Sequence, residues 1–460
     1  MIQRPTIAGE TALPAAEAPS EGMFHRLWHL GLRYARHRAA LTFLLTLFSQ
    51  GAALLTSVIL ARVMPFEAYG EYLYALSWTM LVAQLGILGF DRLAIREVAA
   101  NIARKDPGTL HGFLRFMFRW EMTFIVAASL GAFGLVWALE HAAGVAVPKF
   151  FGWSMLIVPP LVLLNLQMSV VRGTDRVVES QIPEKLVRPL GVLALVGMLC
   201  WWLGSLDAPT VLAVYLVSAL AAGVWAGRDL KRFVPPLPEG VAPVRRSKEW
   251  LTASLHLSTV VLMFTINARA DSLLLGAMDG AAALAIYLVA LRISQSTSLA
   301  VGIFNVLLGP NISSRHALGD RAGLQQLATR YALPILGVNL LTLVPVVLLC
   351  QPLVAIFGPA FAPAVVPLLI LCAGQFATSL AGSAGNLLIN CGEEAASARV
   401  VTIACLTNIG LNLVLIPRFG ASGAAIAASA SLALKSVLLV GLCLRRLRIN
   451  PTPIPFKIAS

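Results

Sequence analysis

The sequence predicts an all-α integral membrane protein of about twelve transmembrane helices, arranged as two halves of six. The chain is 58% hydrophobic and only 12% charged, with a mean hydropathy of +0.80. A soluble domain carries about a quarter of its residues charged. Apolar runs long enough to cross ~30 Å of hydrocarbon recur along the chain, and the cations lie in the gaps between them.

The apolar runs define the expected helices in order. Residues 1–22 are polar and rich in Pro and Ala, so we expect disorder there and no secretory signal. Residues 24–38 place Phe24, Leu27 and Trp28 on one helical face with arginines largely opposite, which is typical of an interfacial helix. The expected spans are 40–62, 71–90, 117–139, 151–171, 189–204, 209–227, 250–276, 282–311, 331–357, 363–390, 398–416 and 421–444.

The orientation follows from the cations. With the N-terminus in the cytoplasm, 29 of the 35 Lys and Arg residues fall on the cytoplasmic side, and Arg62, Lys149 and Arg418 fall on the other. The remaining three lie inside spans. This asymmetry obeys the positive-inside rule, so we expect both termini in the cytoplasm.

A Pro-rich connector divides the chain into two halves. Residues 234–246 read VPPLPEGVAPVRR, inside a polar stretch at 228–249. Residues 60–76 align with 275–291 at 6 identities in 17, with Tyr72 over Tyr287. Six plus six spans in the same orientation is the parallel repeat of many secondary transporters, although two Ala/Leu-rich hairpins also align this well by chance. We therefore expect an N-terminal segment at 1–39, lobes at 40–227 and 250–444, a linker at 228–249 and a cytoplasmic tail at 445–460.

Residues 412–429, NLVLIPRFGASGAAIAAS, interrupt an apolar stretch and restart it at once. Pro417 cannot continue a helix, and Gly420 tolerates the positive φ of a tight reversal. The small residues after Gly423 let another backbone approach closely. The stretch therefore predicts a short hairpin between two closely packed helices.

Several classes of function find no support. The chain has no G-x-x-x-x-G-K-[ST], H-E-x-x-H or G-x-S-x-G motif. Its six cysteines form no C-x-x-C pair, and no His stands at ligand spacing. The cations are not interleaved with aromatics on one polar face, which disfavours nucleic-acid binding. We expect a transporter, with no catalytic residue, no metal site and no cofactor.

Four charges inside the expected spans are the best candidates for a functional interior: Arg269, Asp271, Arg292 and Lys435. The functional interpretation is a cationic cavity that attracts a phosphorylated substrate, because Arg binds phosphate in a bidentate manner. The structural alternative is local neutralisation or snorkelling. Arg269 and Asp271 point about 200° apart on a helix, so we expect no salt bridge between them.

Three motifs resemble one family, the polysaccharide-repeat-unit flippases of the multidrug/oligosaccharidyl-lipid/polysaccharide exporter (MOP) superfamily. They are NIGLNLVLIPRFGASGAAIAAS (408–429), ILARVMPFEAYGEYLYALS with LGILGFDRLAIREVA (59–77 and 85–99), and ARADSLLLGAMDGAAALAIYLVALRIS (268–294). The similarity covers roughly residues 40–445. Lipid II flippases of this superfamily usually have fourteen spans, and no extra pair is evident here.

The resemblance implies a V-shaped, two-lobe transporter of the bacterial inner membrane that works by alternating access. It would flip undecaprenyl-diphosphate-linked oligosaccharide from the cytoplasmic to the periplasmic leaflet. Proton or sodium coupling and contact with polysaccharide polymerase machinery are further expectations. Asp91, Arg92 and Arg96 match the motif after the second span, and we name them with Asp271 and Glu71 as candidates for a gate or for ion coupling. The alternatives are that the two arginines only obey the positive-inside rule and that Glu71 is a carboxylate at the membrane interface.

Two other functions compete with a flippase. A cation-coupled multidrug exporter should hold buried carboxylates in the first lobe, which carries almost none beyond Glu71 and Glu121 near span ends. A membrane glycan polymerase or ligase normally has a large periplasmic loop. The longest such loop expected here is about a dozen residues, at 140–150.

The orientation is testable with single cysteines in a cysteine-free background. Cysteines near Lys149 and Arg418 should react with an impermeant thiol reagent in intact cells, because both positions are expected in the periplasm. Cysteines near Arg232 and Arg446 should not react. Equal labelling near Arg232 and Lys149 would overturn the assignment.

Overall fold

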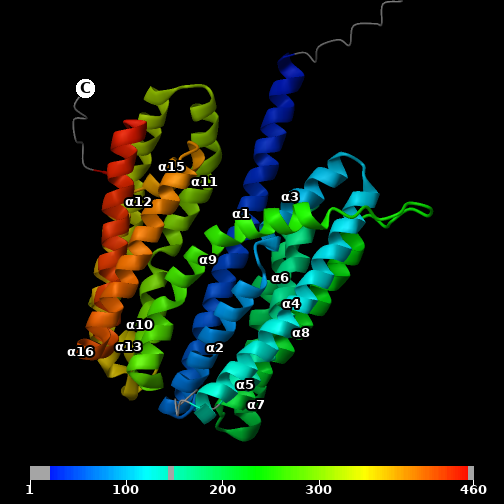
Figure 1. The fold of residues 1–460 in the computed structure, drawn as a ribbon. Helices are drawn as coiled ribbons and strands as arrows, with labels where there is room; N and C mark the ends of the chain where they lie inside the picture. Colours follow the sequence, from blue (N-terminus) through cyan, green and yellow to red (C-terminus); the bar gives the residue numbers. More distant parts are fainter. Residues whose placement is uncertain (1–20, 143–149, 454–460) are drawn as a thin grey trace, which may run out of the picture.

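The computed structural model describes residues 21–142 and 150–453, in which all regular structure is helical. Figure 1 shows two helical bundles with one long helix crossing between them. The N-terminal half comprises α1 (Glu21–Val63), α2 (Phe66–Gly86), α3 (Phe90–Ala103), α4 (Pro107–Ala142), α5 (Phe151–Met155), α6 (Val158–Gly173), η1 (Glu179–Gln181), η2 (Pro183–Val187), α7 (Arg188–Leu203) and α8 (Ala208–Phe233). The crossing helix is α9 (Ser247–Met278).

The C-terminal half follows α9. It comprises α10 (Gly280–Ser296), α11 (Leu299–Ala317), α12 (Arg321–Leu348), α13 (Cys350–Ala355), η3 (Pro359–Ala364), α14 (Val365–Leu380), α15 (Ala384–Asn390), α16 (Glu394–Leu442) and η4 (Cys443–Leu447). The expected all-α membrane fold with two lobes is confirmed.

Within the described ranges, 7 helical segments are long and apolar enough to cross a membrane, or 8 if the bent pair α2–α3 counts as one span. One of these segments, Glu394–Leu447, has 54 residues. A single crossing needs about 20 residues, so this segment is long enough to cross twice. The chain is a multi-pass membrane protein, and the exact number of twelve spans stays a prediction.

The expected hairpin at 412–429 is confirmed inside α16. Gly420 has φ 53° and ψ −129°, a conformation that breaks the helix and that favours glycine. The two arms fold back on each other, since Ser431 Oγ donates to the carbonyl of Ala404 at 2.8 Å. A β-carbon on Gly423 would overlap the backbone of Leu415, so glycine permits this close approach.

Two helices of the bundles are broken at equivalent places. The chain bends by 41° between α2 and α3, where Leu88 and Gly89 both have positive φ. In the second half the expected continuous span 282–311 is divided into α10 and α11 by Thr297 and Ser298. The matching order, a first broken span followed by one long helix (α4 or α12), agrees with the expected parallel repeat.

The ends of the expected segments differ from the observed elements. Helix α1 runs from Glu21 to Val63 without a break, and residues 1–20 lie outside the described part of the chain. The side chains of 21–39 are not described, so an interfacial role for 24–38 stays a prediction. The irregular connector covers only 234–246, because α8 extends to Phe233.

Helix α9 contacts both halves. Near its start, Trp250 packs against Phe113 of α4, with ring centroids 5.4 Å apart, and Ser254 Oγ donates to the carbonyl of Leu88 at 2.5 Å. Its later part packs against α10 and α16. This helix therefore spans the junction between the lobes (Figure 1).

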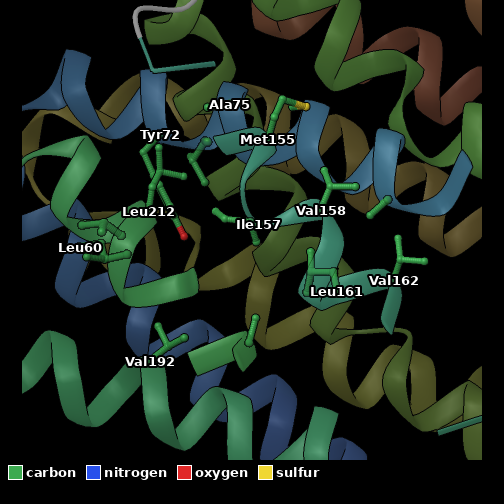
Figure 2. Packing of buried hydrophobic residues seen from close by; sticks show 14 of the residues in the cluster. Leu60, Tyr72, Ala75, Met155, Ile157, Val158, Leu161, Val162, Val192 and Leu212 are labelled. Carbon is green, nitrogen blue, oxygen red and sulfur yellow. The ribbon is translucent and has the colours of Figure 1, made fainter. Parts of the chain in front are cut away.

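Buried apolar side chains fill the core of the N-terminal half. Figure 2 shows five of them converging: Leu60 of α1, Tyr72 of α2, Ile157 at the α5–α6 junction, Val192 of α7 and Leu212 of α8. All of them are at most 6% exposed. This packing fixes α2 and α7, which also line the space between the lobes.

The halves meet closely where α2 and α10 begin, at the lower end in Figure 1. Phe361 of η3 packs edge-on against Phe66 and Tyr69, with centroids 5.1 and 5.8 Å apart. Helices α2 and α10 approach so closely that a β-carbon on Gly70 would overlap the carbonyl group of Ala281. This end of the molecule is closed by backbone contact between the halves.

Replacement of Gly70 by Ala should lower the unfolding temperature of the purified protein, because the added methyl group forces α2 and α10 apart. A matched control is Gly223→Ala in α8, where a β-carbon meets nothing within 4 Å. That substitution should leave stability unchanged or raise it by about 0.5–1 kcal/mol through helix propensity. Thermal unfolding in detergent measures both, and equal behaviour of the two variants would contradict the close contact.

Candidate functional site

Two adjoining cavities lie between the halves of the chain. The central cavity has a volume of about 630 Å³ and is lined by residues of α1, α2, η2, α7, α8, α9 and α10. The second cavity, of about 470 Å³, is lined by residues of α2, α3, α6, η2, α7 and α9. They share lining residues, among them Glu184, Arg188 and Arg269. The two cavities are therefore neighbouring parts of one interior space.

The charged side chains that line the central cavity are mostly cations. Lys185, Arg188, Arg269 and Arg292 face one carboxylate, Glu184. The sequence singled out Arg269 and Arg292, and the structure brings both to this cavity, one from each side of the α9–α10 turn. Lys435 lies in α16 and lines neither cavity. The binding role of all three stays a prediction.

Lys185 and Arg188 fall between the expected spans 151–171 and 189–204, so the sequence predicts both in a cytoplasmic loop. In the structure, η2 continues into α7, so both residues are helical and line the cavity. Lys185 Nζ donates to Thr46 Oγ1 at 2.7 Å and to Gln181 Oε1 at 2.5 Å. Arg188 Nη2 lies 3.8 Å from Glu184 Oε1. The helical extension carries these two cations into the space between the lobes.

Aromatic and hydroxyl groups complete the lining. Tyr69, Tyr72 and Tyr215 line the central cavity, and the guanidinium of Arg188 lies 5.5 Å from the ring centroid of Tyr215. The Tyr69 hydroxyl lies 2.7 Å from Ser57 Oγ. Such groups can exchange hydrogen bonds with a hydroxylated ligand.

Arg269 and Arg292 have different surroundings. Arg292 Nη1 donates to the carbonyl of Ala53 at 2.9 Å, which joins α10 to α1. Arg269 makes no hydrogen bond or ion pair with the described residues, and it borders both cavities. Its charge is therefore available to a ligand in either cavity.

Asp271 is held by three donors within the C-terminal half. Asn408 Nδ2 and Asn412 Nδ2 donate to Oδ1 at 2.6 and 2.7 Å, and the Tyr287 hydroxyl donates to Oδ2 at 2.9 Å. As expected, no salt bridge joins it to Arg269 among the described residues. These three donors satisfy the carboxyl oxygens in a site that the cavities do not reach.

The remaining candidates are spread out. Asp91 and Arg92 line the second cavity, where Asp91 Oδ1 is buried without a partner. Arg96 is exposed and pairs with Glu97 at 3.4 Å. Glu71 is half-buried in α2 and lines neither cavity. In the described part of the chain, no three His, Cys, Asp or Glu side chains come together as metal ligands.

Comparisons with known proteins identify the family and the fold of the chain. A family model described as "Polysaccharide biosynthesis protein" matches residues 36–314. No curated protein sequence matches the chain. Among solved structures, it is similar to an inward-facing multidrug resistance transporter of the MATE family in the MOP superfamily, at 12% identity and a TM-score of 0.73. That match covers 87% of this chain and 94% of the other.

Two further similarities help to define the fold. The lipid II flippase MurJ in an inward closed conformation is 14% identical, with a TM-score of 0.68 over 89% of this chain and 87% of MurJ. An outward-facing transporter of the MATE family gives a TM-score of 0.61 at 12% identity, covering 90% of this chain and 96% of the other. The chain thus has the fold of MOP-superfamily transporters.

Proposed function

Because the chain belongs to the polysaccharide biosynthesis protein family, we propose that it moves lipid-linked oligosaccharide across a membrane. The substrate class is a saccharide joined through a diphosphate to a polyprenyl lipid such as undecaprenol. Movement runs from the cytoplasmic to the periplasmic leaflet of the bacterial inner membrane, with both chain termini in the cytoplasm. The lobes alternate in opening to the two sides.

The observation that carries this proposal is the excess of cations in the central cavity. Lys185, Arg188, Arg269 and Arg292 outnumber the single carboxylate there. A cation in an apolar helix costs ~3 kcal/mol on insertion scales unless something compensates it. A diphosphate supplies the missing negative charge, and Arg binds phosphate oxygens in pairs.

The rest of the lining suits the rest of the substrate. The tyrosine, serine and threonine hydroxyls of the central cavity match the hydroxyl groups of a saccharide. Asp91 and Arg92 border the second cavity, where we place a gate. Asp271 is our candidate for coupling to a proton or sodium ion, because it is an ionisable residue inside a membrane-spanning helix. Polysaccharide polymerase machinery is the expected downstream partner.

A multidrug exporter is the second candidate, since solved MATE transporters share the fold. An exporter of cationic drugs needs negative charge where the drug binds. The central cavity offers the opposite, with one carboxylate among four cations. The charge of the cavity therefore favours an anionic substrate.

Deletion of the gene should abolish one surface or secreted polysaccharide, because its lipid-linked repeat unit can no longer leave the cytoplasmic leaflet. The unit should accumulate there, which is measured by extracting and quantifying lipid-linked saccharides. Normal polysaccharide together with altered resistance to cationic dyes would favour the drug exporter.

Replacement of Arg269 or Arg292 by Ala should abolish complementation of the deletion strain, because the diphosphate loses a bidentate partner. Lys should rescue only partly, since an ammonium cannot bridge two phosphate oxygens. Lys435→Ala should matter less, and Arg330→Ala, at an exposed position outside both cavities, is the matched control. Membrane levels are checked by immunoblot. Full polysaccharide from both Arg→Ala variants at normal abundance would refute the cationic site.

A further inference from the structure

Helix α4 buries a glutamate in the middle of an apolar stripe. Phe113, Met117, Glu121 and Ile125 follow one another at a spacing of four residues, so they lie along one helical face. Each is at most 1% exposed, and Glu121 is 0% exposed. The stripe faces the interior of the N-terminal half, where α4 packs against α2, α3, α5, α6 and α9.

The carboxyl group of Glu121 has no partner. Neither Oε1 nor Oε2 makes a hydrogen bond, and no ion pair includes this residue in the described part of the chain. An ionised carboxylate without partners is very costly in such surroundings. The usual way to avoid this cost is to take up a proton.

A second carboxyl group lies on the neighbouring helix. Asp91 is at the start of α3, which packs on α4, and a negative charge on Asp91 disfavours one on Glu121. Its Oδ1 is also buried without a partner, yet the residue lines the second cavity. Glu121 is therefore sealed in the core, and Asp91 connects it to a space open to water.

No cation makes an ion pair with Glu121 in the described part of the chain, whereas Arg92, Arg188 and Arg269 line the second cavity together with Asp91. Helix α5 carries no titratable residue. The acidic and tyrosine residues of α2 all lie in its first half. Helix α6 carries only Arg172, in its last turn. The neighbouring part of α9 offers three charged or titratable side chains, all exposed: Lys248, Glu249 and His256. On α3 and α4 themselves, Arg92, Arg96, Arg115 and Arg119 are exposed.

We propose that Glu121 is a proton-binding site and that Asp91 links it to the second cavity. The proton enters from a hydronium ion in the second cavity, which leaves as water, and it departs by the reverse step. A metal cation fits less well, because it needs a shell of oxygen ligands. The described residues bring no third His, Cys, Asp or Glu side chain to the pair.

Loss of the proton has a structural effect. It leaves two like charges on α3 and α4, and their repulsion disfavours the packing of these helices. Since α9 packs on both helices near Trp250, the charge state of the pair acts on the helix that crosses between the lobes. Only this use of the proton in transport rests on the proposed function, whereas proton binding itself does not.

A hydrophobic carbodiimide tests the site on the purified full-length protein in detergent. The carboxylic acid adds to the reagent, with its proton going to nitrogen and its oxygen to the central carbon. Intact-mass analysis should show an adduct at Glu121 whose formation falls as the pH rises. Glu121→Gln should lose the adduct, and Glu239→Gln, in the exposed connector, should keep it. Asp91→Asn should move the midpoint to lower pH by roughly one unit or more, because the neighbouring negative charge is gone.

Tryptophan fluorescence gives an independent measurement. Trp120 adjoins Glu121 and stacks on Phe116 at 6.2 Å, which packs on Trp250 at 5.6 Å. Emission should change with pH in the wild type and stay flat in Glu121→Gln, with size-exclusion elution showing that the variant is folded. Labelling of Glu121→Gln at the wild-type level, or a wild-type rate independent of pH, would overturn the proposal. If the purified protein labels as expected while the deletion strain still makes normal polysaccharide, that result refutes the proposed flippase function and supports the proton site.

Discussion

The backbone contact between α2 and α10 determines how the rest of the molecule is arranged. Gly70 allows the two helices to touch, and Phe361 seals the contact against Phe66 and Tyr69. With this end closed, the polar side chains of both halves line a space farther along the same helices. The cavities thus exist because the lobes are joined at one end.

The bilayer gives this interior its chemistry. Charges on membrane-spanning helices cannot face lipid cheaply, so they turn inward and need partners there. Asp271 has its partners, three donors on neighbouring helices. The cations of the central cavity lack a comparable number of acidic partners, and Glu121 has none. These two unbalanced places are where we propose ligands, an anion in the first and a proton in the second.

Sequence patterns predicted the fold better than the site. The hairpin was visible because Pro417 and Gly420 are strong local signals, whereas Thr297 and Ser298 break a helix without any such signal. Arg269 and Arg292 stood out because they interrupt apolar runs. Arg188 did not, because a cation at the end of a span also satisfies the positive-inside rule. Only the helical continuity of η2 and α7 shows that it lines the cavity.

The bond from Arg292 to the carbonyl of Ala53 joins α10 to α1 at the central cavity, and its acceptor is a neutral oxygen. A phosphate oxygen carries far more negative charge than a carbonyl oxygen and can accept from an arginine in pairs, so a phosphate competes well for this donor. If an anionic substrate takes this donor, as we propose, the lobes lose one of the bonds that join them. Binding of the substrate would then be the event that loosens the contact between α1 and α10.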